Sequence, residues 1–131
     1  MTDIYFVRHA ESDITVHDDR SRPLTKKGLR DRSLVTAFLK EKGISVIASS
    51  PYKRAYDTVA EFARQKGIEI LCLEAFKERH IAGGWIEDFA AFSRRQWEDF
   101  SYKRADGESL GDVQARNVKA LYELLSSYPD Q

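Results

Sequence analysis

Two groups of polar residues in this chain could bind a small anion, and each group follows a short apolar run. Arg8 and His9 come directly after residues 4–7, and Arg54 comes shortly after residues 45–48. Ligands bind beyond the carboxyl ends of the strands in open parallel sheets, so neighbouring strands would bring these side chains together. Guanidinium groups match phosphoryl oxygens in charge and geometry, and a neutral imidazole is a competent nucleophile. We therefore expect a phosphoryl pocket, although His9 alone is equally well explained as an ordinary surface or core residue.

Three apolar runs rich in β-branched residues predict the strands that would position these groups, at residues 4–7, 45–48 and 68–73. Stretches with helical periodicity separate them. The first begins near Thr25, which can cap it, and ends before Gly43. The second starts with Ser50 as the cap and Pro51 at the first helical position, and it ends at Gly67. This alternation is typical of a parallel sheet covered by helices.

The remaining sequence predicts helices. Aromatic residues from Trp85 to Phe100 indicate a helical excursion that packs on the sheet or lines the pocket. Residues 109–112 resemble a capping box, and an apolar helical face continues to Leu125. A parallel α/β unit returns from such a helix to another strand, whereas this chain ends at Gln131. We therefore expect one domain over residues 1–131, incomplete at its C-terminus.

Composition limits the classes of partner and compartment. Lysine plus arginine number 21, as do aspartate plus glutamate, so the formal net charge is zero and nucleic acid is not expected. No apolar stretch is long enough for a membrane span, and the N-terminus carries no signal-peptide pattern. The single cysteine, Cys72, lies in an apolar run that predicts a buried thiol and fits a reducing compartment. The cytoplasm is the expected location.

Five segments, in order along the chain, resemble motifs of the histidine phosphatase superfamily, which includes cofactor-dependent phosphoglycerate mutases. They are VRHAES at 7–12, RPLTKKG at 22–28, SSPYKRAYDT at 49–58, ERH at 78–80, and GESL at 107–110 followed by Arg116. An ordered set of five is far more specific than a lone Arg-His pair. The resemblance implies an α/β fold of the phosphoglycerate mutase kind. This is a three-layer sandwich with a mainly parallel sheet flanked by helices, whose C-terminal strand and helix are missing from this chain.

The resemblance also implies a role for each matching residue. His9 would attack phosphorus and carry the phosphoryl group, while Arg8 and Arg54 would bind its oxygens. Glu78 would protonate the leaving alkoxide and then activate water, although a solvated surface carboxylate is the alternative explanation. No metal or other cofactor is expected, because the arginines supply the positive charge.

Smaller roles follow for two further residues. Thr15 would contact the phosphate or be a plain loop residue, and Arg79 would reach the substrate or form a surface ion pair. The sequence also departs from the family. A second catalytic histidine is absent, and neither His17 nor His80 matches it, while Ala10 replaces the usual glycine after the nucleophile. Losing one such phosphate ligand would cost on the order of a hundredfold or more in rate, by analogy with the loss of an oxyanion donor.

These observations lead to the hypothesis of a phosphatase that hydrolyses a phosphomonoester through a phosphohistidine. Phosphoglycerate mutase-type transfer would use the same groups. A non-catalytic phosphoryl-ligand binding or regulatory module is the alternative that the missing histidine favours. The expected partner is a small phosphorylated substrate, with no nucleic acid and no membrane. Neither the substrate's identity nor the oligomeric state follows from the sequence.

Overall fold

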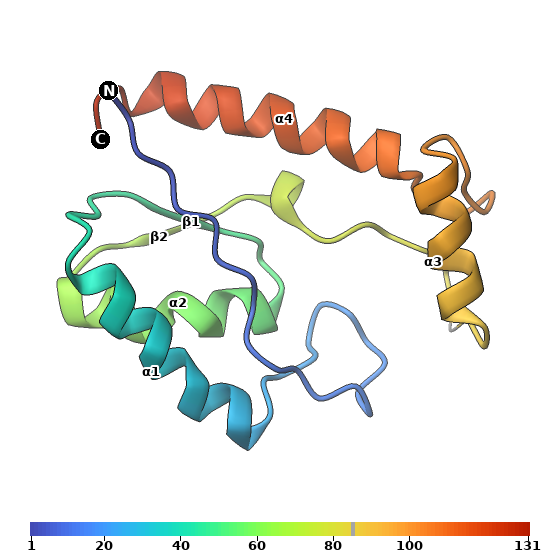
Figure 1. Cartoon of the computed structure of the whole chain (residues 1–131), viewed down its shortest axis with the longest axis horizontal. Coiled ribbons are helices and arrows are strands. Elements are labelled where there is room, and N and C mark those ends of the chain that lie inside the picture. The colour runs from blue at the N-terminus through green and yellow to red at the C-terminus, as the bar shows by residue number, and fades with distance from the viewer. Residues whose placement is uncertain (85) are drawn as a thin grey trace.

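Helices cover both faces of a small parallel sheet in this computed structural model. Strands β1 (Ile47–Ser49) and β2 (Ile70–Cys72) pair in parallel over their full length. Helices α1 (Lys26–Lys40) and α2 (Lys53–Lys66) lie on one side of the sheet, and α4 (Leu110–Ser127) lies on the other (Figure 1). The predicted α/β sandwich with a parallel sheet flanked by helices is confirmed.

Local sequence explains three of the helix ends. The Thr25 hydroxyl accepts a hydrogen bond of 3.0 Å from the amide of Gly28 and so caps α1. Gly67 ends α2 in a left-handed conformation with φ of 67°, which glycine adopts without steric cost. Ser109 and Asp112 form a reciprocal capping box at the start of α4. These three ends agree with the sequence predictions.

The start of α2 differs from the prediction. Tyr52 is the N-cap and the helix begins at Lys53, whereas Ser50 was expected to cap it. The Ser50 hydroxyl instead accepts from the Tyr52 amide at 3.1 Å and closes a turn before the helix. The amide of Lys53 donates to the Arg20 carbonyl at 3.0 Å, which fixes the helix start against another loop. The turn places Arg54 in the first turn of α2.

The best-packed core lies between the helices α1 and α2 and the sheet. Phe62 of α2 is fully buried there, and Ile47 of β1 and Leu39 of α1 pack around it. Partly buried apolar residues surround this cluster: Val35, Ile44, Val59, Ile68 and Ile70. Burial of this apolar face anchors α2, and with it Arg54, against the sheet.

The prediction of a strand at residues 4–7 is wrong. These residues form no sheet pairing, and no backbone hydrogen bond joins them to another described residue. The Phe6 side chain is 80% exposed. A cavity of about 630 Å³ lies between this segment, β1 and the apolar face of α4. An apolar run forms a strand only where a partner strand accepts its backbone hydrogen bonds, and none of the described strands pairs with residues 4–7.

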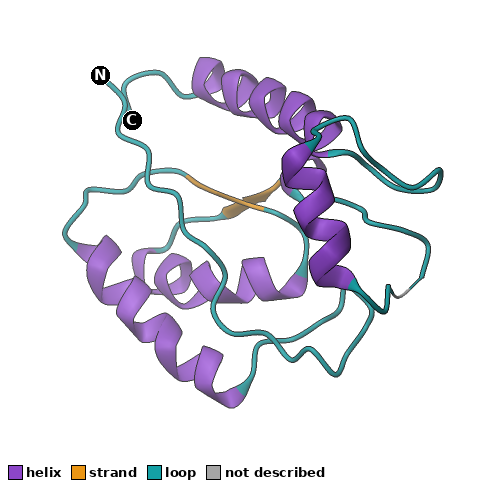
Figure 2. Cartoon of the chain, turned by 45° about the vertical axis from the view of Figure 1, so that its right-hand side comes forward, coloured by secondary structure: helices purple, strands orange, loops and turns teal. Residues whose placement is uncertain are grey.

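The structure describes residues 1–84 and 86–131, so Trp85 lies outside the described residues. Phe89, Phe92 and Trp97 of the expected helical excursion belong to helix α3 (Phe89–Glu98), which lies beside the start of α4 (Figure 2). Phe92 is buried, in keeping with a packing role, whereas Trp97 is exposed. The two chain ends meet, since the Met1 amino group pairs with Asp130 at 2.9 Å.

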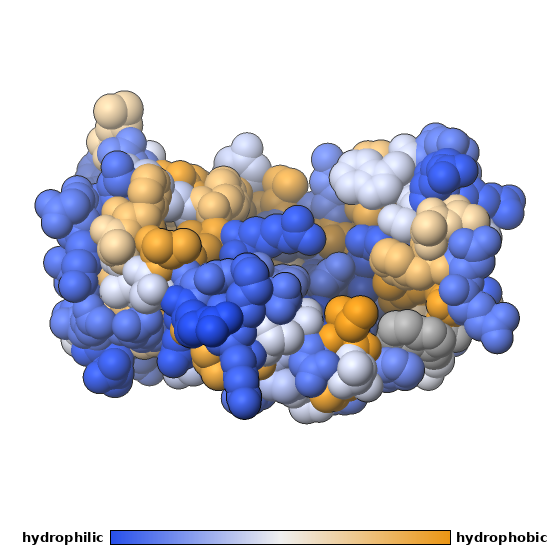
Figure 3. Space-filling model, turned by 60° about the horizontal axis from the view of Figure 1, so that its bottom comes forward, coloured by the Kyte–Doolittle hydropathy of each residue, from blue (hydrophilic) through white to orange (hydrophobic). Residues whose placement is uncertain are grey.

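Surface exposure corrects one further prediction. Cys72 was expected to be buried, but its thiol is exposed at the end of β2. β2 pairs only with β1 in the described chain, so its outer edge has no covering strand. Apolar side chains also reach the surface on the face seen in Figure 3. No helix among the described residues is long and apolar enough to cross a membrane.

Candidate active site

One buried hydroxyl ties the segment that carries His9 to helix α2. The Thr58 hydroxyl accepts from the Ala10 amide at 2.9 Å and donates to the Arg54 carbonyl at 2.7 Å. Thr58 is almost fully buried, so water does not compete for these hydrogen bonds. This bridge brings His9, the neighbour of Ala10, to the first turn of α2, where Arg54 lies. The segments that carry His9 and Arg54 are therefore joined although residues 4–7 form no strand.

The His9 ring is oriented by the main chain. Its Nδ1 atom lies 2.7 Å from the Ala10 carbonyl oxygen, and the side chain is partly buried. A carbonyl oxygen only accepts hydrogen bonds, so this contact requires the proton on Nδ1. The lone pair of the neutral ring is then on Nε2, which is the nitrogen able to act as a nucleophile.

Arg54 is the most deeply buried charged group in this region. Its side chain is 3% exposed, and it donates to the Asp19 carbonyl and to the Glu78 carboxylate, the latter at 2.9 Å. The Asp19 carboxylate is 3.7 Å away, and the Tyr52 ring centroid is 5.0 Å from the guanidinium carbon. A buried guanidinium is stable only with anionic or hydrogen-bonding partners. Arg54 meets this condition through Glu78 and Asp19.

Glu78 occupies the other side of that ion pair. Its side chain is half exposed, and its second oxygen lies 4.0 Å from an Arg79 nitrogen. The carboxylate can therefore change partners without crossing a packed interior. The ion pair brings Glu78 and Arg54, from separate motifs of the sequence, into direct contact.

The other three predicted site residues, Arg79, Arg8 and Thr15, differ in what their side chains contact. Arg79 turns toward α3, where it donates to Gln96 at 2.8 Å and lies over the Phe89 ring. Arg8 is exposed and forms no hydrogen bond or ion pair with another described residue. The Thr15 hydroxyl donates to the Asp13 carboxylate at 2.6 Å in an exposed turn, with no contact to His9 or Arg54.

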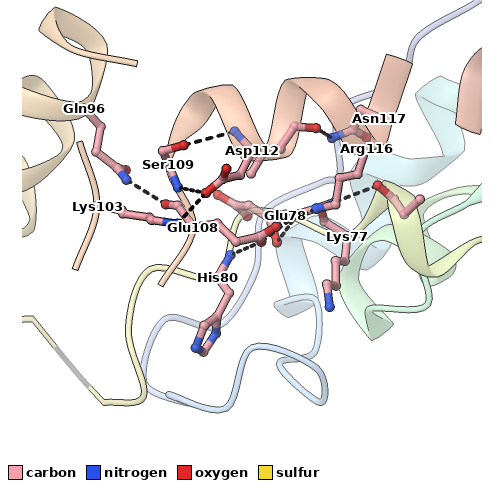
Figure 4. A network of polar contacts seen from close by, with 12 residues as sticks. Lys77, Glu78, His80, Gln96, Lys103, Glu108, Ser109, Asp112, Arg116 and Asn117 are labelled. Carbon is pink, nitrogen blue, oxygen red and sulfur yellow. Dashed lines mark hydrogen bonds and ion pairs between the residues drawn. The ribbon is translucent and has the colours of Figure 1, made fainter. Parts of the chain in front are cut away.

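Sequence reasoning missed several residues that organise the site. Thr58 lay inside a quoted motif, but its hydroxyl bridge follows only from the packing of two distant segments. Asp19 lies in a segment with several charged residues, and no spacing in the sequence connects it with Arg54. Arg116 and Glu108 were quoted as motif residues without a role, although they form a closely bonded pair at 2.8 Å behind Glu78 (Figure 4).

That pair has an electrostatic signature. The Arg116 guanidinium, through its hydrogen bonds to the carboxylate, holds the pKa of Glu108 below its usual value against the opposing effect of partial burial.

The described residues contain no group of three or more His, Cys, Asp or Glu side chains arranged to hold a metal ion.

The sequence profile of the histidine phosphatase superfamily (branch 1) matches residues 4–131. The chain belongs to this superfamily. Among curated members, it is 27% identical over 139 residues to glucosyl-3-phosphoglycerate phosphatase of Mycobacterium tuberculosis, covering 97% of this chain and 62% of that protein. It is also 29% identical over 140 residues to phosphoserine phosphatase 1 of Hydrogenobacter thermophilus, covering 94% and 64%. This superfamily member thus spans less than two thirds of either relative.

Solved structures show the same fold. The complex of a mycobacterial glucosyl-3-phosphoglycerate phosphatase with inorganic phosphate superposes with a TM-score of 0.80 at 24% identity, covering 93% of this chain and 62% of that one. The alpha-ribazole phosphatase from Shigella flexneri gives a TM-score of 0.72 at 18% identity, with coverage of 93% and 66%. At these identities the superpositions establish the histidine phosphatase fold for this chain.

Proposed function

We propose that this histidine phosphatase superfamily member hydrolyses a small phosphomonoester through a phosphohistidine on His9, with Glu78 as the proton donor. The observation that carries the proposal is the chain of contacts from Ala10 through Thr58 to Arg54 and Glu78. It joins a candidate nucleophile, a buried anion-binding group and a candidate acid. The relatives named as phosphatases support the same class of reaction.

The first half-reaction uses the lone pair on Nε2 of His9. This nitrogen attacks phosphorus, and the bond between phosphorus and the ester oxygen breaks as the new N–P bond forms. Arg54 binds the oxygens of the transferring group, and the unpaired Arg8 adds a second guanidinium. An incoming phosphoryl group competes with Glu78 for Arg54. The displaced Glu78 carboxyl, once protonated, gives its proton to the departing alkoxide.

The second half-reaction regenerates the histidine. The Glu78 carboxylate takes a proton from a water molecule as the water oxygen attacks phosphorus. The N–P bond breaks, inorganic phosphate leaves, and the electron pair returns to Nε2 of His9. In this scheme the chain supplies all the proton transfers, and the arginines supply the positive charge.

Phosphate release tests this function. A panel of phosphomonoesters that includes phosphoserine and a phosphorylated sugar acid is incubated with the chain and with its His9→Ala variant. Release that disappears in the variant supports the proposal. Phosphate-column binding without turnover by either chain would favour the alternative, a phosphoryl-ligand binding module.

A mutase-type transfer is distinguished by its acceptor. Transfer to a second hydroxyl instead of water would release little free phosphate and would require a phosphorylated enzyme at the start. Measuring the product ester alongside free phosphate separates the two reactions. We favour hydrolysis, because the curated relatives cited above are both named as phosphatases.

A further inference from the structure

The Arg116 guanidinium on α4 is bonded to the main chain around Glu78. One terminal nitrogen donates to the carbonyls of Ala75 and Lys77 at 2.6 and 2.7 Å, and the other lies 3.3 Å from the Glu78 carbonyl. The same group forms a two-bond fork with the Glu108 carboxylate at 2.8 and 2.9 Å. These contacts engage every nitrogen of the guanidinium (Figure 4).

Glu108 fixes the chain on the far side of Glu78. Its carboxylate accepts from the His80 amide at 2.8 Å, and its own amide donates to the His80 carbonyl at 2.6 Å. The neighbouring Gly107 makes this approach possible, because a Cβ atom there would overlap the Ile81 carbonyl. The ion pair between Arg116 and Glu108 therefore holds main-chain groups both before and after Glu78.

The segment held in this way has no regular structure of its own. Residues 78–82 belong to no helix or strand, so no sheet or helix hydrogen bonds set the position of Glu78. The Glu78 side chain is half exposed, whereas Arg116 and Glu108 are 19% and 23% exposed. The partly buried, bidentate pair of Arg116 and Glu108 is more rigid than the half-exposed Glu78 carboxylate beside it.

We propose that Arg116, acting through Glu108 and the main chain, is a positioning residue that aims the Glu78 carboxyl at the leaving group. Arg116 touches neither His9 nor Arg54, so its effect on the reaction passes through the Glu78 segment. The inference rests on the proposed function, in which Glu78 is the proton donor.

Leaving-group dependence is the measurement that a merely structural role would not change. A p-nitrophenolate leaves without help, whereas an alkoxide must be protonated as it departs. Glu78→Gln should lower kcat/KM for alkyl phosphates by about a hundredfold or more and affect kcat/KM for p-nitrophenyl phosphate far less, because kcat/KM reports the steps up to the phosphohistidine and not the later attack of water. Arg116→Ala should show the same selectivity, with a loss of at least about tenfold confined to alkyl phosphates. The double variant should be no more selective than Glu78→Gln.

Controls separate the possible failures. Lys103→Ala removes a neighbouring exposed ion pair with Asp112 and should leave the turnover of both kinds of substrate unchanged. Equal losses on both substrates in Arg116→Ala, beside a selective Glu78→Gln, would overturn the positioning role alone. If Glu78→Gln affected both kinds of substrate equally, Glu78 would not be the proton donor, and the positioning role of Arg116 would be contradicted with it.

Hydrogen exchange gives a readout that does not depend on turnover or on a drastic variant. Arg116→Lys keeps the charge but cannot form the fork and the carbonyl contacts at once. The His80 amide, which donates to Glu108, should exchange about tenfold faster in this variant, while amides of α2 keep their protection. Unchanged exchange at His80 would overturn the inference.

Discussion

Arg54 donates a 2.9 Å hydrogen bond to the Glu78 carboxylate, so the group expected to bind phosphate is held by the group expected to deliver a proton. A phosphoryl dianion that enters the site meets a guanidinium already oriented by the Asp19 carbonyl and by the Tyr52 ring. In the proposed reaction, binding of the anion and release of the Glu78 carboxyl would therefore be coupled through Arg54.

Replacing Arg54 by lysine should lower kcat/KM by about a hundredfold, because one ammonium group cannot bond both the Asp19 carbonyl and an anion as a guanidinium fork does. Steady-state phosphate release measures this loss. The adjacent Lys53, which forms an exposed pair with Asp57, provides the matched control. Lys53→Ala should be nearly unchanged, and an equal loss in both variants would contradict the assignment.

Thr58→Val should destabilise the chain by about 1–3 kcal/mol, since valine keeps the shape but leaves the Ala10 amide without its partner. Urea unfolding measures the difference. Thr36→Val is the comparison, because the buried Thr36 hydroxyl makes longer contacts of 3.2 and 3.4 Å. We predict a smaller loss of unfolding free energy for Thr36→Val, and a loss of turnover for Thr58→Val alone.

Two phenylalanines test where the core lies. Phe62 is fully buried and its replacement by alanine should cost about 3–5 kcal/mol, whereas Phe6→Ala should change stability by less than about 0.5 kcal/mol. Chemical denaturation of both variants checks this contrast. A large loss at Phe6 would mean that residues 4–7 pack as a strand in solution.

The sequence was most informative where local signals decide structure. The Thr25 and Ser109 caps and the Gly67 end each depend on a few neighbouring residues, and all three were predicted. The strand at residues 4–7 was not correctly predicted, because an apolar β-branched run needs a pairing partner that lies elsewhere in the fold. The prediction that Cys72 is buried was wrong for the same reason, because its burial depends on what covers the edge of β2.

For the site, motif order predicted His9, Arg54 and Glu78, and hydrogen bonds join the segments that carry them. The bridge through Thr58 and the support from Arg116 could not be predicted, because each joins segments far apart in the sequence. Their residue types are ordinary ones for a helix interior, so composition and periodicity carry no signal for these contacts.

Acid should weaken the support behind Glu78. The pKa of Glu108 is lowered in the folded chain, chiefly by its hydrogen bonds to Arg116. A lowered folded-state pKa contributes stability that is present above the ordinary glutamate value and is lost as pH falls through the folded value. The unfolding free energy of Glu108→Gln should therefore fall less between pH 5 and pH 3 (roughly the range in which glutamates titrate) than that of the unmodified chain. An identical acid dependence in both chains would contradict this contribution.

The central claim is that His9 carries the phosphoryl group on Nε2, and trapping that intermediate tests it most directly. The chain is mixed with p-nitrophenyl phosphate, quenched in alkali, and analysed by intact mass and peptide mapping. We predict one added phosphoryl group that is stable to alkali, labile to acid, located on His9 and absent from His9→Ala. A phosphoryl group on another residue, or turnover that survives in His9→Ala, would contradict the account.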